Sequence, residues 1–69
     1  MIVILAGTYV QGLNYAKGQG LSPRDYVIPS RPEQVYGLDV QDVRKVGTWR
    51  DLPQEVLDAV AERAWRTDA

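Results

Sequence analysis

The run Ile2-Val3-Ile4-Leu5-Ala6 constrains the fold more than any other part of the chain. It is apolar throughout, its first three side chains are β-branched, and Gly7-Thr8 ends it. An uninterrupted run of this kind predicts a strand buried on both faces, because a strand with one face in water alternates apolar and polar residues. We therefore expect the central strand of a parallel sheet that is covered on both sides.

A helix and a short strand are expected next. Thr8 is a suitable N-cap, and apolar residues then recur at helical spacing until two glycines end the element, namely Tyr9, Leu13 and Ala16, then Gly18 and Gly20. A turn through Pro23 leads into a strand over 25–28, which Pro29 stops. Its shortness and the proline indicate an edge strand.

The second half of the chain repeats this alternation. Ser30 can cap a short helix over 31–36, with Pro32 at its first position and Gly37 at its end. A strand follows over 42–47, with the pattern of a charged edge. The last helix begins near Pro53 and has the strongest amphipathic pattern, a stripe of Val56, Leu57, Val60, Ala61 and Ala64. Trp65 lies at the margin of this stripe, and we expect a packed side chain there rather than the alternative, an interface residue.

Strands that alternate with helices imply right-handed crossovers and a parallel sheet. We predict a single α/β domain over 1–69, with a minimal Rossmann-like βαβαβα pattern and strand order 2-1-3. The first and second helices then cover opposite faces of the sheet, and the third packs beside the first. The short second helix leaves an apolar face around Val35, Tyr36 and Leu38 poorly covered. That face predicts self-association, as in a homodimer.

The candidate site lies at the carboxyl edge of this sheet. Strands one and three are neighbours in the order 2-1-3, and both end in a Gly-Thr pair, so these ends are expected to meet where α/β sheets bind ligands. Arginines near the strand ends offer cations for a phosphate or carboxylate. The full set of candidate binding residues is Gly7, Thr8, Arg31, Gly47, Thr48, Trp49 and Arg50. The competing interpretation is structural, because glycine ends strands and threonine caps helices in many α/β proteins.

Trp49 has two interpretations as well. Its indole, beside the guanidinium of Arg50, can anchor a partner. It can equally lie over the last helix as a lid on a small core.

Composition excludes several classes of function. The chain has no Cys and no His, which removes disulfides, thiolate or imidazole metal sites and most nucleophilic catalysis, so no metal, cofactor or enzymatic activity is expected. A net charge of −1 gives no field that attracts nucleic acid or membrane. The apolar N-terminal run is too short for a signal peptide or a membrane span, so a cytoplasmic protein is expected.

Several short motifs resemble small uncharacterised proteins encoded by actinobacterial phages. They are residues 3–8 (VILAGT), Tyr15-Ala16, Gly20-Leu21, Ser30-Arg31-Pro32, Gly37-Leu38 and Val46-Gly47-Thr48-Trp49. The resemblance implies a viral origin and the cytoplasm of an infected bacterium, and it carries no known activity.

Two functions follow as hypotheses. The first is a non-enzymatic protein-interaction module that binds a host or viral protein through the carboxyl edge and the Trp49 loop. The alternative is a small domain that binds and sequesters a nucleotide or another phosphoanion at Gly7-Thr8 and Gly47-Thr48.

Overall fold

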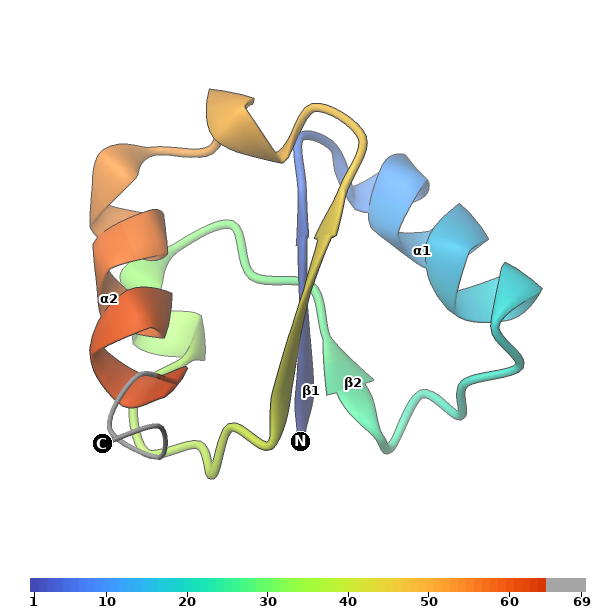
Figure 1. The fold of residues 1–69 in the computed structure, drawn as a ribbon, viewed down its shortest axis with the longest axis horizontal. Helices are drawn as coiled ribbons and strands as arrows, with labels where there is room; N and C mark the ends of the chain where they lie inside the picture. The colour runs from blue at the N-terminus through green and yellow to red at the C-terminus, as the bar shows by residue number, and fades with distance from the viewer. Residues whose placement is uncertain (65–69) are drawn as a thin grey trace.

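A computed structural model describes residues 1–64 of the chain and confirms the α/β fold (Figure 1). Two helices and three strands follow in the order β1 (Ile2–Ala6), α1 (Tyr9–Gly18), β2 (Tyr26–Val27), β3 (Asp42–Val46) and α2 (Gln54–Ala64). Two short 3₁₀ turns complete the described part, η1 (Pro32–Gln34) before β3 and η2 (Trp49–Asp51) before α2. Trp65 lies outside the described residues.

The sheet is parallel and has the predicted order β2-β1-β3. β1 pairs with β3 along its whole length, from Ile2 beside Asp42 to Ala6 beside Val46. Its pairing with β2 covers only two residue pairs. From Val3 to Ala6 every side chain of β1 is at most 3% exposed. The continuous apolar run is therefore the buried centre of the sheet, as its pattern predicts.

α1 covers one face of the sheet. Ile4 and Ala6 of β1 form a core with Ala16 of α1 and with Ile28, which follows β2. Gly12 lets the helix come this close, because a Cβ added there would lie 2.8 Å from two carbon atoms of Ile28. The glycine inside the helix is thus explained by packing, which offsets its low helix propensity. Tyr9 is not part of this core, since it is 63% exposed.

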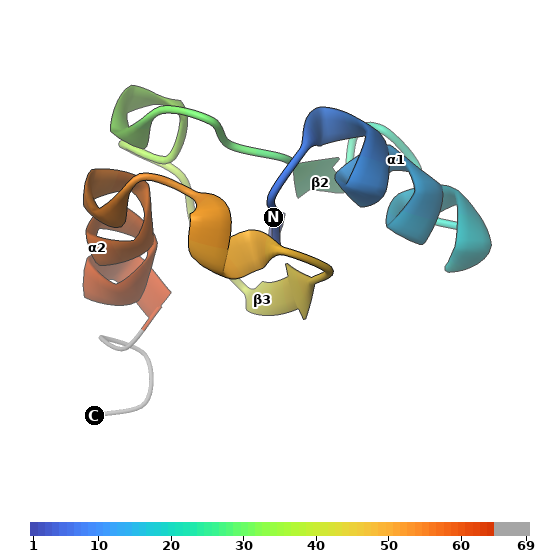
Figure 2. The ribbon, with the colours of Figure 1, turned by 90° about the horizontal axis from the view of Figure 1, so that it is seen from above.

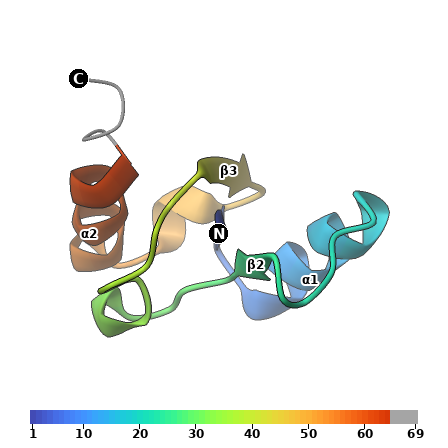
Figure 3. The ribbon, with the colours of Figure 1, turned by 90° about the horizontal axis from the view of Figure 1, so that it is seen from below.

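α2 covers the opposite face, beside η1, and not the face of α1 (Figures 2 and 3). Val3 and Leu5 of β1 form the second core, which they share with Val35, Val40, Val56, Ala59 and Val60. The prediction that the last helix packs beside the first is therefore wrong. The right-handed rule applies to a helix that connects two parallel strands, and α2 connects no two strands of the sheet described over residues 1–64.

The helical segment between β2 and β3 is shorter than predicted. The expected helix over 31–36 is a single 3₁₀ turn, with Pro32 at its first position as predicted. The side chain of Gln34 closes the turn, because its Oε1 accepts hydrogen bonds from the backbone N–H groups of Ser30 and Arg31, at 2.6 and 3.0 Å.

The apolar face expected to stay open is covered. Val35 is fully buried against the second core, Leu38 is partly buried there, and only Tyr36 is largely exposed. The prediction that an uncovered apolar face around Val35, Tyr36 and Leu38 drives self-association is therefore wrong for this surface. Within residues 1–64, no helix has both the length and the apolar character needed to cross a membrane.

Candidate functional site

The ends of β1 and β3 meet at the carboxyl edge of the sheet, as the strand order predicts. A Cβ added to Gly7 would overlap the Thr48 hydroxyl and lie 2.5 Å from the Thr48 carbonyl oxygen. Gly47 has a φ of +54°, a left-handed conformation that favours glycine. Three of the predicted site residues, Gly7, Gly47 and Thr48, thus lie side by side.

Gln11 of α1 occupies the centre of this junction. Its Oε1 accepts hydrogen bonds from the backbone N–H of Gly7, the backbone N–H of Thr48 and the Thr48 hydroxyl, each at 3.2 Å. Thr8 caps α1 as predicted, its hydroxyl accepting from the Gln11 N–H at 3.2 Å. The donors that an anion would need at this edge therefore already have an acceptor within the chain.

The other three predicted site residues lie apart from this junction. Arg31 is exposed in the connection after β2 and lines neither of the two hollows described here. A small hollow of about 80 Å³ lies next to Gly7 and Thr8, walled by Pro29 and Leu52. Trp49 and Arg50 belong to η2 and line a different and much larger groove. The structure therefore divides the predicted site into the junction, the groove with Trp49 and Arg50, and the separate Arg31.

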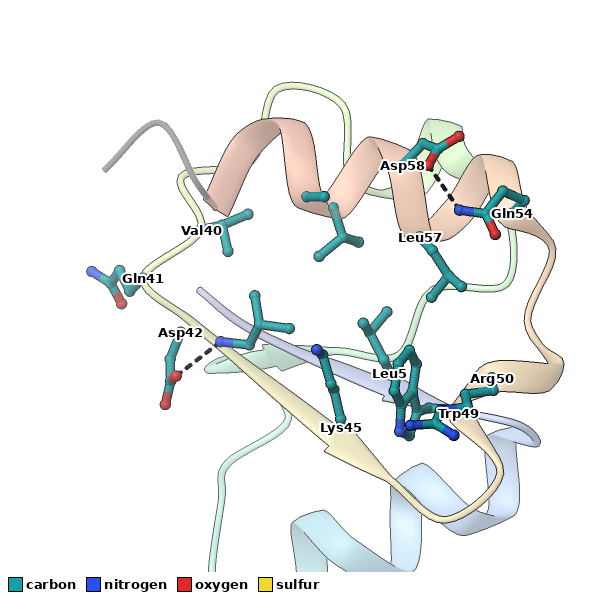
Figure 4. A pocket seen from close by; sticks show the side chains of 13 residues that line it. Leu5, Val40, Gln41, Asp42, Lys45, Trp49, Arg50, Gln54, Leu57 and Asp58 are labelled. Carbon is teal, nitrogen blue, oxygen red and sulfur yellow. Dashed lines mark hydrogen bonds between the residues drawn. The ribbon is translucent and has the colours of Figure 1, made fainter. Parts of the chain in front are cut away.

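That groove has a volume of about 770 Å³ and lies between β3 and α2 (Figure 4). Its apolar lining comes from β1, the segment before β3, β3, η2 and α2, and includes Leu5, Val40, Val43, Trp49, Leu57 and Val60. It exists because α2 packs beside η1, over β1, and leaves the same face of β3 uncovered (Figure 2). Leu57, which the helical stripe assigned to the core, is only partly buried at this groove.

Two cations lie over the indole of Trp49 in the groove. The Nζ of Lys45 is 4.8 Å from the ring centroid, and the Arg50 guanidinium carbon is 5.3 Å from it. Cations at these distances are attracted to the face of an indole. Neither one forms a salt bridge with an acidic side chain of residues 1–64. Trp49 itself packs against the second core, so it is partly a lid and partly a wall of the groove.

The two acidic residues among the described lining of the groove, Asp42 at its rim and Asp58, have partners of their own. Asp58 accepts a hydrogen bond from the Gln54 amide at 2.9 Å. Asp42 accepts from the Nε of Arg44 at 2.6 Å and from the backbone N–H of Val43 at 2.8 Å. The hydrogen bond from Arg44 holds the pKa of the Asp42 carboxyl below its ordinary value. Among the groove residues within 1–64, the positive charges of Lys45 and Arg50 are thus the ones left for a ligand.

Sequence reasoning missed Lys45 and Gln11. Lys45 stands two residues after Val43, and residues two apart on a strand share a face. Because Val43 packs against the second core, Lys45 lies on the groove side of β3. Gln11 is different, because its contact with Thr48 joins residues 37 positions apart and no local pattern marks it.

Comparison of the chain with protein-family models, curated proteins and solved structures found no match. The resemblance to phage-encoded proteins stays a prediction.

Proposed function

We propose that this chain is a non-enzymatic protein-interaction module whose groove between β3 and α2 binds a segment of a host or viral protein. The observation that carries the proposal is the pair of cations over Trp49, without an acidic partner in residues 1–64, next to an apolar floor. Charge complementarity then favours a segment in which an acidic side chain neighbours an apolar one. The apolar side chain would pack against Leu57 and Trp49.

The energy of such a contact is concentrated at Trp49. Tryptophan and arginine dominate the binding energy of many interfaces, above all where surrounding side chains exclude water. A carboxylate placed beside Lys45 and Arg50 would gain charge-assisted hydrogen bonds, each about 1.5–3 kcal/mol. One such bond corresponds to about a 10- to 100-fold change in affinity.

The proposal is tested by selecting binders from a random peptide library on the immobilised protein. We expect the selected peptides to be enriched in acidic residues next to apolar ones. The double variant Lys45→Glu/Arg50→Glu should lose at least about tenfold in affinity for them. A matched control is Lys17→Glu/Arg24→Glu, which makes the same change of charge at two exposed positions outside the groove.

Far-UV circular dichroism establishes that both variants are folded. Equal affinity of the parent and the groove variant, or equal losses in both double variants, would overturn the proposal. A selection that yields no peptide above background would also count against it.

The phosphoanion alternative has less geometric support. The N–H groups at the Gly7 and Thr48 junction already donate to Gln11. A thermal-shift screen with inorganic phosphate and nucleotides tests it, since a ligand at 100 times its Kd raises stability by about 2.7 kcal/mol. Gln11→Ala frees these donors, so a shift that is larger in this variant would support anion binding at the junction.

A further inference from the structure

The outer side of β3 is an open sheet edge. Within residues 1–64, β3 pairs only with β1, and the sheet ends there (Figure 3). The backbone N–H of Val43 donates to the exposed carboxylate of its neighbour Asp42, so this N–H faces away from β1. Backbone groups alternate between the two sides of a strand, and those of Lys45 therefore face the open side as well. Such an edge is a template for a further strand.

The charges along this edge complement themselves. Asp42 and Arg44 point to the same face of the sheet, because their side chains form an ion pair at 2.6 Å. If a second β3 lay antiparallel with Val43 opposite Val43, each Asp42 would face an Arg44 across the pair. Opposite charges at such cross-strand positions are favourable, and like charges there are destabilising. The same short sequence thus supplies both halves of the contact.

Arg44 is held in place for this role. Its Nη1 donates to the hydroxyl of Tyr15 on α1 at 2.7 Å, and its Nε donates to Asp42. A guanidinium has five N–H donors, so three of them are still available for a second carboxylate. The remaining N–H groups lie at an exposed edge, where a partner can reach them.

We propose that two copies of this chain join through their β3 edges, antiparallel, with Val43 opposite Val43 and Asp42 opposite Arg44 of the second copy. The contact is isologous, because one two-fold axis relates both halves. That axis is perpendicular to the sheet, so both α2 helices lie on one face of a six-stranded sheet. The two grooves then adjoin over the paired β3 strands. The proposal does not rest on the groove's binding a partner.

The test is a charge exchange measured as molecular mass by light scattering over a wide concentration range. Asp42→Lys places Lys opposite Arg44, and Arg44→Glu places Glu opposite Asp42. Each variant alone should raise the Kd of the dimer by at least about tenfold. An equimolar mixture of the two should restore the dimer as a heterodimer, because every cross-strand pair is then of opposite charge.

A covalent trap checks the register. The chain has no Cys, so Val43→Cys introduces a single thiol, which should form an intermolecular disulfide readily, since directly opposite residues lie about 5.5 Å apart. Asn14→Cys, on the exposed side of α1, is the control and should cross-link far more slowly. A parent that stays monomeric at the highest soluble concentration overturns the proposal. So does a mixture that fails to restore a dimer formed by the parent. Neither measurement uses a peptide, so the two proposals can fail separately.

Discussion

Replacing Gly7 with Ala tests the close approach of β1 and β3. The added Cβ would overlap the Thr48 hydroxyl and lie 2.5 Å from the Thr48 carbonyl oxygen, which belongs to the backbone and cannot rotate away. Overpacking of this kind costs about 1–3 kcal/mol. Moving the two segments apart would also weaken the hydrogen bonds from Gly7 and Thr48 to Gln11, each contributing about 1 kcal/mol.

A smaller effect opposes this loss. Compared with glycine, alanine reduces the conformational entropy of the unfolded chain, which raises the free energy of unfolding by about 0.4–1 kcal/mol. We expect a net loss of about 2–4 kcal/mol in the free energy of unfolding. For a domain of this size, that loss corresponds to a melting temperature lower by about 10–25 °C, measured by circular dichroism.

The matched control is Gly18→Ala, the same substitution at the last residue of α1. No atom lies within 4 Å of a Cβ added there, so the change should be neutral or stabilising by up to about 1 kcal/mol. Adding Thr48→Gly to Gly7→Ala removes the hydroxyl but not the carbonyl and should recover part of the loss. A Gly7→Ala protein that melts with the parent would refute the convergence of the two strand ends.

Two further predictions concern the core and the β3 edge. Val56 is fully buried, so Val56→Ala should lower the free energy of unfolding by about 2–3 kcal/mol. Leu57 lies at the groove, so Leu57→Ala should lower it by less, although leucine is the larger side chain. Denaturant titrations of both variants compare the two losses, and a larger loss for Leu57→Ala would contradict the placement of Val56 in the core and Leu57 at the groove. The lowered pKa of Asp42 contributes stability above the ordinary carboxyl pKa of about 3.9. This contribution is lost as the pH falls through the folded-state pKa, so Asp42→Asn should melt slightly below the parent at neutral pH and together with it in strong acid. A difference that persists in acid would exclude the ion pair as its cause.

The candidate site was only partly readable from the sequence. The meeting of Gly7 with Thr48 followed from two local facts, the Gly-Thr pairs at the strand ends and the adjacency of the strands. The position of Trp49 and Arg50 in the groove could not be predicted from the sequence, because it depends on how η2 directs the chain toward α2. The acceptor role of Gln11 also depends on tertiary contacts, since its partner Thr48 is remote in the sequence.

The centre of the fold follows from the amino-acid pattern alone. A continuous apolar run predicts the central strand, which places β1 between β2 and β3. Given this order, the right-handed crossovers put α1 and η1 on opposite faces of the sheet. The position of α2, by contrast, depends on tertiary packing. Within residues 1–64, α2 does not connect two strands, so the crossover rule does not assign its apolar stripe to either face of the sheet. The helix packs beside η1. That single choice buried Val35, uncovered one face of β3 and created the groove around Trp49.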